Sequence, residues 1–212
     1  MEKEAEPVLS FLEEKTEELY CGLKIVKGRL YGKPCAVVIC GIGKVNAACG
    51  AQYAIDVLGA KVIVNFGVAG GLNTSLEVGK TYCVDKAVQY DFDLTQLNGT
   101  KIGTLDECAD NYIPLSAADG YPIKKLGTGD RFNDSKEDFK LLTEVLGADL
   151  RDMEGGAIAQ VCMHSKIKCY IFKTVSDLAG SGSTTEQYLK NLSLCFGNMK
   201  REIKKIAEIT NG

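Results

Sequence analysis

Two carboxylates in the second half of the chain stand at positions where ligand chemistry is expected. Glu154 opens a run of small residues that predicts a helix, and Asp177 follows an apolar run, residues 170–175, that predicts a strand. Open α/β sheets bind their ligands in the crevice outside the carboxyl ends of the strands. The positions of Glu154 and Asp177 therefore predict that both side chains face one ligand-binding crevice.

The elements that would position these carboxylates alternate along the chain. Apolar periodicity predicts helices over residues 4–15, 45–58, 136–145, 155–164 and 184–209. Strands are predicted over residues 23–30, 35–40, 61–66, 81–88, 125–127, 149–152 and 168–175, and the near-continuous apolar character of 61–66 predicts a buried strand. Residues 91–123 show few periodic signals and are expected to be irregular. This alternation, without a linker, predicts a single α/β domain over residues 1–212, with a mixed central sheet flanked by helices.

The composition excludes several classes of function. The chain has 212 residues, 45% of them hydrophobic, and a net charge of −3, which indicates a soluble globular protein and argues against a nucleic-acid partner. No apolar run approaches the length of a membrane span, so no membrane association is expected. Met1 is followed at once by charged residues, which argues against a signal peptide and predicts a cytoplasmic protein.

The cysteines, the histidine and the glycine motifs carry little chemistry of their own. Nine cysteines occur without a Cys-x-x-Cys pair, which favours small core thiols over a metal site or disulfides. His164 is the single histidine and no nucleophile elbow accompanies it, so a Ser-His-Asp or Cys-His mechanism is nearly excluded. Residues 41–46 begin like a dinucleotide fingerprint, but Asn46 replaces the third glycine. No metal ion and no cofactor are expected.

Four segments together resemble one family. They are residues 41–45 (Gly-Ile-Gly-Lys-Val), 66–72 (Phe-Gly-Val-Ala-Gly-Gly-Leu), 152–159 (Asp-Met-Glu-Gly-Gly-Ala-Ile-Ala) and 175–177 (Val-Ser-Asp). In this order they resemble the signature segments of the 5′-methylthioadenosine/S-adenosylhomocysteine nucleosidases, which belong to the nucleoside phosphorylase superfamily. The resemblance implies a nucleoside phosphorylase-like fold, a small-molecule nucleoside substrate, and hydrolysis of an N-glycosidic bond with release of adenine.

The resemblance also implies roles for three carboxylates. Asp177 matches the general acid that protonates the departing purine, a role that suits a partly buried carboxyl group with a raised pKa. Glu154 matches the carboxylate that holds the ribose hydroxyls near the developing positive charge. Glu4 matches the residue that orients and deprotonates the attacking water, and Met153 is expected to pack against the sugar.

Further positions match the family's substrate contacts. Phe132 corresponds to the aromatic residue that stacks on adenine, and Asn133 to the position whose backbone meets the edge of the base. Ala69 and Gly70 are expected to let the backbone approach the base closely. Ile42 is expected to line the pocket for the 5′-alkylthio group, which the family completes from a second subunit, so the resemblance implies a homodimer.

Three more substrate-binding positions are Val68, Lys173 and Ser176. Ser176 belongs to the Ser-Asp motif. Val68 stands where relatives often have a serine or threonine near the water and the ribose. Lys173 occupies the position of an arginine near the water, and its ammonium can substitute as a point charge. Tyr188 is the nearest aromatic candidate to cover the substrate.

The beginning of the chain departs from the family pattern. The family has a short apolar strand ahead of the acidic segment that contains Glu4, and this chain starts at Met1 without that strand. We therefore expect Glu4 to be less well fixed than in relatives, because chain termini are usually poorly ordered.

Two alternatives to the hydrolase remain open. A phosphate-dependent purine nucleoside phosphorylase would need cationic groups that grip phosphate, and the few arginines (29, 131, 151 and 201) do not lie near residues 67–72. A catalytically weakened nucleoside-binding relative would bind the substrate without releasing the base. The sequence does not rank methylthioadenosine against S-adenosylhomocysteine or other purine nucleosides.

Overall fold

The computed structural model describes residues 1–106 and 108–210, which form alternating helices and strands. In chain order these are α1 (Glu2–Leu9), β1 (Leu12–Tyr20), β2 (Leu23–Leu30), β3 (Lys33–Ile39), α2 (Lys44–Asp56), β4 (Val62–Gly71), β5 (Thr81–Gln89), α3 (Thr95–Asn98), β6 (Ile113–Pro114), β7 (Ile123–Thr128), α4 (Lys136–Lys140), a π-helical turn (Leu141–Val145), β8 (Leu150–Asp152), α5 (Gly155–Ser165), β9 (Lys168–Leu178) and α6 (Thr184–Thr210).

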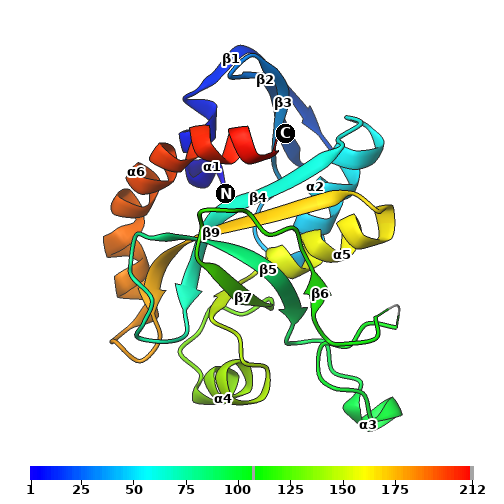
Figure 1. The fold of residues 1–212 in the computed structure, drawn as a ribbon, viewed down its shortest axis with the longest axis vertical. Helices are drawn as coiled ribbons and strands as arrows, with labels where there is room; N and C mark the ends of the chain where they lie inside the picture. Colours follow the sequence, from blue (N-terminus) through cyan, green and yellow to red (C-terminus); the bar gives the residue numbers. More distant parts are fainter. Residues whose placement is uncertain (107, 211–212) are drawn as a thin grey trace.

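The larger sheet is mixed and closes on itself. Its strand order is β6-β5-β7-β8-β4-β9, and β5 also pairs with β9. The β4–β9, β5–β7 and β7–β8 pairs are parallel, whereas β4–β8, β5–β6 and β5–β9 are antiparallel. Figure 1 shows α6 on one side of β4 and β9, with α2 and α5 on the other. The prediction of a mixed central sheet flanked by helices is therefore confirmed.

A smaller antiparallel sheet, in the order β1-β2-β3, stands apart from the larger one. Its two turns, Cys21–Gly22 and Tyr31–Gly32, have positive φ at both residues, as in the type I′ turns that join tightly paired strands. The helix predicted over residues 4–15 is wrong after Leu9, because residues 12–20 pair with β2. The Glu-rich composition of that segment favours a helix locally, but charged residues also suit an exposed edge strand, and the cross-strand pairing prevails.

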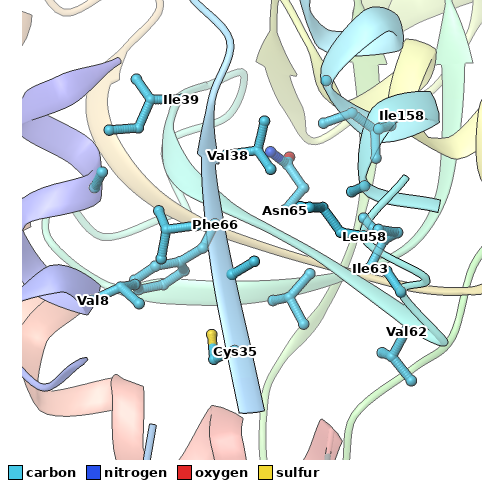
Figure 2. Close-up of a pocket in the computed structure, with 18 of the residues that line it drawn as sticks. Val8, Cys35, Val38, Ile39, Leu58, Val62, Ile63, Asn65, Phe66 and Ile158 are labelled. Atoms are coloured by element: carbon cyan, nitrogen blue, oxygen red, sulfur yellow. The ribbon is translucent and has the colours of Figure 1, made fainter. Parts of the chain in front are cut away.

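A cavity of about 920 Å³ lies between β3 and β4, with α1, α2 and α6 around it. Figure 2 shows its wall, which is mostly apolar and includes Val38, Ile63 and Phe66. The two strands belong to different sheets, so over most of its length β4 is paired only with β9. As a result Val64 is 38% exposed, and the prediction of a buried strand over residues 61–66 is wrong.

The core and the cysteines are distributed around the closed sheet. Leu126, Leu150, Ile171 and Phe172 are fully buried within it. None of the nine cysteines forms a disulfide; four are buried, whereas Cys21 and Cys49 are exposed, so the prediction of core thiols applies only to part of the set. In the part of the chain that the structure describes, no group of side chains is suited to hold a metal ion, and no helix is both long and apolar enough to cross a membrane.

Candidate active site

Three strands bring the predicted site residues together. Gly70 of β4 has Asp177 of β9 as its Cα partner on one side and Arg151 of β8 on the other. The expectation that no arginine lies near residues 67–72 is therefore wrong, because strand pairing brings Arg151 to Gly70. Glu154 lies two residues after the end of β8 and is the N-cap residue of α5. The residues around Glu154 and Asp177 thus lie in neighbouring strands of one sheet, although they are far apart along the chain.

Asp177 is a buried carboxyl group with one oxygen unengaged. Its side chain is 2% exposed, and Oδ1 accepts a hydrogen bond of 2.6 Å from the Ser176 hydroxyl. Oδ2 has no hydrogen-bond partner among the described residues. Burial raises the pKa of Asp177 above its ordinary value, against the opposing effects of the Ser176 hydrogen bond and the Arg151 charge. Such a group is suited to hold a proton on Oδ2 and to donate it.

Glu154 is held by the loop that joins β3 to α2. Its Oε1 accepts a hydrogen bond of 2.9 Å from the backbone N–H of Gly43, which lies between β3 and α2. Burial and then the charge of Asp152 raise the pKa of Glu154, whereas the Lys173 charge lowers it. Its second oxygen has no partner in the hydrogen bonds described, which leaves it available for a ligand hydroxyl.

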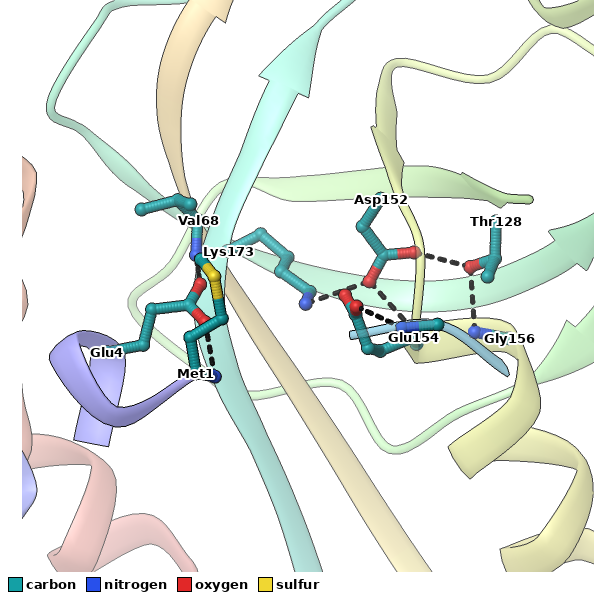
Figure 3. A network of polar contacts seen from close by, with 10 residues as sticks. Met1, Glu4, Val68, Thr128, Asp152, Glu154, Gly156 and Lys173 are labelled. Carbon is teal, nitrogen blue, oxygen red and sulfur yellow. Dashed lines mark hydrogen bonds and ion pairs between the residues drawn. The ribbon is translucent and has the colours of Figure 1, made fainter. Parts of the chain in front are cut away.

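Glu4 lies on α1 and is anchored at both carboxylate oxygens. Oε1 accepts a hydrogen bond of 3.1 Å from the Val68 N–H, and Oε2 lies 2.8 Å from the Met1 ammonium. Figure 3 shows Glu4 on one side of Lys173 and Glu154 on the other. These contacts engage both oxygens of the Glu4 carboxylate, although Glu4 lies three residues after Met1. The expectation that Glu4 is less well fixed than in relatives stays a prediction.

Lys173 makes a buried ion pair. Its Nζ lies 2.8 Å from Oδ2 of Asp152, and the two side chains are 3% and 2% exposed. Although burial acts to lower it, the pKa of Lys173 is raised by the charges of Asp152, Glu154 and Glu4 and by the hydrogen bond to Asp152. The ammonium is therefore charged and sits among three carboxylates, with Asp152 as its direct partner.

Two glycines of β4 leave room for the carboxylates. A Cβ atom at Gly67 would lie 2.9 Å from Oε1 of Glu4. A Cβ atom at Gly70 would lie 2.8 Å from Oδ2 of Asp177 and 3.1 Å from Nε of Arg151. The two distances to carboxylate oxygens are shorter than the van der Waals contact of carbon and oxygen allows. Each carboxylate therefore occupies space that only glycine leaves open. Between these glycines the Ala69 carbonyl accepts a hydrogen bond of 3.3 Å from Ser176.

The aromatic residues predicted at the site face each other. The rings of Phe132 and Tyr188 lie 5.6 Å apart, edge to face. Burial raises the pKa of Tyr188, and the charges of Glu4, Glu154 and Asp177 raise it further. The sequence named Tyr188 only as the nearest aromatic residue; the structure brings it to Phe132.

The remaining predicted contacts are less direct. The side chain of Asn133 is engaged with Asp138 at 2.8 Å, which leaves only its backbone for a ligand. Ile42 has an exposed side chain beside Gly43. Met153 is half-buried between Asp152 and Glu154. The cavity of Figure 2 reaches Glu4, Glu154 and Lys173 but not Asp177 or Phe132, so it adjoins one part of the site only.

Several residues that the sequence did not single out hold the site in place. Asp130 accepts a hydrogen bond of 2.8 Å from the Lys44 N–H, and the Lys44 ammonium lies 2.6 Å from Asp91, so these residues hold the turn that presents Gly43. Asp152 and Thr128 contact the first turn of α5. Asp152 lies within one of the four segments that resemble the family. Its contacts are with residues of other strands, and such contacts produce no periodic pattern in the sequence.

Comparison with known proteins defines the class first. Residues 1–208 match the family model described as "Phosphorylase superfamily", and the chain belongs to that superfamily. Its fold is that of the futalosine hydrolase of Helicobacter pylori, with a TM-score of 0.90 at 23% identity over 98% of this chain and 94% of that chain.

Sequence relatives define the family more narrowly. The chain is 34% identical over 206 residues to the 5′-methylthioadenosine/S-adenosylhomocysteine nucleosidase of Geobacillus thermodenitrificans, across 90% of this chain and 87% of that protein. It is 29% identical over 191 residues to the aminodeoxyfutalosine nucleosidase of Campylobacter jejuni, across 85% and 83%. Within the superfamily, the chain belongs to the 5′-methylthioadenosine/S-adenosylhomocysteine nucleosidase family, and it is an enzyme that hydrolyses nucleosides.

Proposed function

We propose that this enzyme hydrolyses the N-glycosidic bond of 5′-methylthioadenosine, S-adenosylhomocysteine or both, and releases adenine. The observation that carries the proposal is the buried Asp177 carboxyl group, whose raised pKa and unengaged Oδ2 suit a proton donor to a leaving base. The name of the Geobacillus thermodenitrificans relative supports the choice of substrate.

In the proposed mechanism, Asp177 donates its proton to a purine nitrogen while the bond between the base and the sugar breaks. The sugar then carries positive charge, which the Glu154 carboxylate stabilises while it holds the ribose hydroxyls. Glu4 orients a water molecule and takes its proton as the water oxygen bonds to the sugar carbon. Lys173 lies close to Glu154, and its charge lowers the pKa of Glu154 and so favours the ionised form of that carboxylate.

The remaining site residues form the proposed substrate pocket. Phe132 stacks on the base, and Tyr188, 5.6 Å from it, closes the pocket over the sugar. Such stacking contributes about 1–3 kcal/mol for a base on an aromatic ring. The proposed pocket is completed by the backbone or side chains of Ile42, Val68, Ala69, Gly70, Asn133, Met153 and Ser176.

Water is a better nucleophile for this site than phosphate. A phosphate dianion beside Lys173 would meet the carboxylates of Glu4, Glu154 and Asp152, and like charges so close repel strongly. Arg151 is oriented by Thr184 at 3.1 Å and acts on Asp177, at the base end of the site. This charge pattern disfavours the phosphorylase alternative.

The test is the release of adenine from purified enzyme in phosphate-free buffer. We expect adenine from 5′-methylthioadenosine, and we expect Asp177→Asn to lower kcat by about 10²-fold or more, since a general acid contributes that much. Product that requires phosphate would identify a phosphorylase. Tight binding of the nucleoside without adenine would identify a binding protein and would refute the hydrolase.

A second candidate substrate follows from the Campylobacter jejuni relative, whose name is aminodeoxyfutalosine nucleosidase. The same release assay with aminodeoxyfutalosine distinguishes the two substrate classes. A kcat/KM for aminodeoxyfutalosine well above that for both adenosine thioethers would replace the primary assignment.

We propose further that two copies of the chain associate through α2. Val45 is 74% exposed, and Cys49, four residues later on the same helical face, is also exposed. Exposed apolar residues beside a site mark an interaction surface. We expect light scattering to give the mass of a dimer, and Val45→Asp to give a monomer with a raised KM, while Val145→Asp, at an exposed valine of the π-helical turn, serves as the charge control. A monomeric wild-type enzyme with full activity would contradict this.

A further inference from the structure

The first turn of α5 is capped by residues from other strands. Glu154 is its N-cap residue, but the Glu154 side chain makes no capping hydrogen bond. Instead the Gly155 N–H donates to Oδ2 of Asp152 at 2.8 Å, and the Gly156 N–H donates to Oγ1 of Thr128 at 2.7 Å. An N-cap side chain usually accepts such bonds itself. Because Asp152 and Thr128 accept them, the Glu154 carboxylate is free to turn to Gly43 and the site.

The two glycines after Glu154 make this arrangement possible. A Cβ atom at Gly155 would lie 2.9 Å from Oδ2 of Asp152, and one at Gly156 would lie 2.9 Å from Cβ of Thr128. Only glycine at both positions lets the two capping side chains approach the helix end this closely. The Gly-Gly pair is therefore a part of the cap.

Asp152 joins this cap to the buried lysine. Its Oδ1 accepts a hydrogen bond of 2.6 Å from Thr128, and its Oδ2 receives both the Gly155 N–H and the Lys173 ammonium, each at 2.8 Å. Figure 3 shows the chain of contacts from Lys173 through Asp152 to Thr128 and Gly156, with Glu154 beside it. The pair between Asp152 and Lys173 keeps the ammonium from pairing directly with Glu154.

We infer that Asp152 is a positioning residue for Glu154: it caps α5 in place of Glu154 and engages Lys173, which leaves the Glu154 carboxylate free to hold the ribose. This inference rests on the proposed function, because it assigns Glu154 a role in holding substrate. Both oxygens of Asp152 are engaged by protein groups, so we assign it no contact with the substrate.

The charges around Glu154 make the effect of Asp152 measurable, because they act on the pKa of Glu154. The groups that face it are Asp152 on β8, Lys173 on β9, Glu4 on α1, Tyr188 on α6 and the Cys40 thiol after β3. After burial, the charge of Asp152 is the next cause that raises the pKa of Glu154. Removal of that charge lowers the pKa of Glu154, and the released Lys173 ammonium lowers it further. Since Glu154 acts as the ionised form, the acid limb of the kcat/KM profile then moves to lower pH.

The experiment is a double-mutant cycle of Asp152→Asn with Glu154→Gln, read as adenine release and as a pH profile. Asp152→Asn keeps the size of the side chain and removes its charge. In the wild-type background we expect kcat/KM to fall by roughly 10- to 100-fold, as for a catalytic group moved out of position. In the Glu154→Gln background we expect a fall of less than about threefold, because the residue through which Asp152 acts is already impaired.

The comparison variant is Thr128→Val, which loosens the cap and leaves the charge of Asp152 in place. We expect it to lower the melting temperature without shifting the acid limb, whereas Asp152→Asn shifts that limb to lower pH. If Asp152→Asn does not fold, the same cycle is run with Asp152→Asn/Lys173→Gln, which leaves no unpaired buried charge.

Equal losses for Asp152→Asn in both backgrounds, with an unshifted acid limb, would mean a structural role only and would overturn the inference. A wild-type enzyme that releases no adenine but binds 5′-methylthioadenosine refutes the proposed hydrolysis alone, and the cycle is then read as nucleoside affinity. A wild-type chain that neither cleaves nor binds nucleosides overturns both.

Discussion

At the scale of single residues, the site depends on two glycines of β4, which have no side chain. Gly67 and Gly70 stand three residues apart on that strand and leave the spaces that Glu4 and Asp177 occupy. The two carboxylates differ in their freedom to move. Glu4 is the far end of a flexible side chain on α1, whereas Asp177 belongs to the neighbouring strand and is fully enclosed.

We expect Gly67→Ala to lower activity far more than stability. The new methyl group would displace the Glu4 carboxylate, which can turn aside at little cost to the fold, but a displaced catalytic group loses roughly 10²-fold in rate. Steady-state kinetics and thermal melting measured on the same preparation check this.

The controls for Gly67→Ala lie at two other glycines. Gly197→Ala on α6, where a Cβ atom meets nothing within 4 Å, should leave activity unchanged and stabilise the protein by about 0.5–1 kcal/mol. Gly70→Ala should lower both activity and melting temperature, because Asp177 cannot retreat. Full activity of Gly67→Ala would mean that Glu4 has no part in the reaction.

The sequence could predict the residues of the site better than the contacts that fix them. Glu154 and Asp177 lie at strand ends, a pattern that is local and visible in the chain. The pairing of Lys173 with Asp152, or of Glu154 with the Gly43 N–H, joins positions on different strands and loops. No local pattern records such pairings, because they depend on how the strands are ordered in the sheet.

At the scale of elements, the small sheet depends on its two tight turns. Cys21 and Tyr31 each precede a glycine and have φ of 46° and 49°. Asparagine adopts this left-handed conformation more readily than cysteine or tyrosine.

We therefore expect Cys21→Asn to stabilise the protein, by less than the roughly 1–2 kcal/mol that the left-handed conformation costs an ordinary residue. Tyr31→Asn is the matched comparison: its turn has the same geometry, but the Tyr31 ring lies 5.8 Å from Phe11 and that contact is lost. Denaturant melts of both variants provide the measurement. Destabilisation by Cys21→Asn would contradict the assigned turn geometry.

Element prediction succeeded where one pattern was strong and failed where two competed. The long helix predicted from residue 184 and the strand predicted over residues 23–30 agree closely with α6 and β2. The helix predicted over residues 4–15 follows the apolar spacing of Val8, Phe11 and Leu12, and only pairing with β2 makes residues 12–15 a strand. The exposure of β4 could not be predicted either, because it results from the absence of a hydrogen-bonded neighbour strand along most of one edge.

At the scale of the whole molecule, the strands form two unequal parts. β5, β7, β8, β4 and β9 follow one another around a closed set of pairings, because β5 also pairs with β9. Lys173 lies where β9 is paired on both sides, and Asp177 lies further along β9, where it pairs with β4. Glu4 lies outside this set, on α1, which packs against α6, β3 and β4.

The closed set of pairings has a consequence for the rate at which backbone amides exchange with solvent. A strand paired on both sides exchanges only when much of the sheet opens, whereas an edge strand opens alone. In hydrogen–deuterium exchange we expect peptides from β9 to stay protected longest and peptides from β1, paired only with β2, to exchange first. Equal protection of the two would contradict this.

We expect a similar difference in exchange rate between two parts of the active site. The proposed proton donor and the lysine lie on β9, which we expect to exchange slowly, while the carboxylate proposed to activate water lies on a short helix outside the closed sheet. With the proposed roles, we expect the contacts to the base to stay fixed between turnovers and the position of the attacking water to fluctuate.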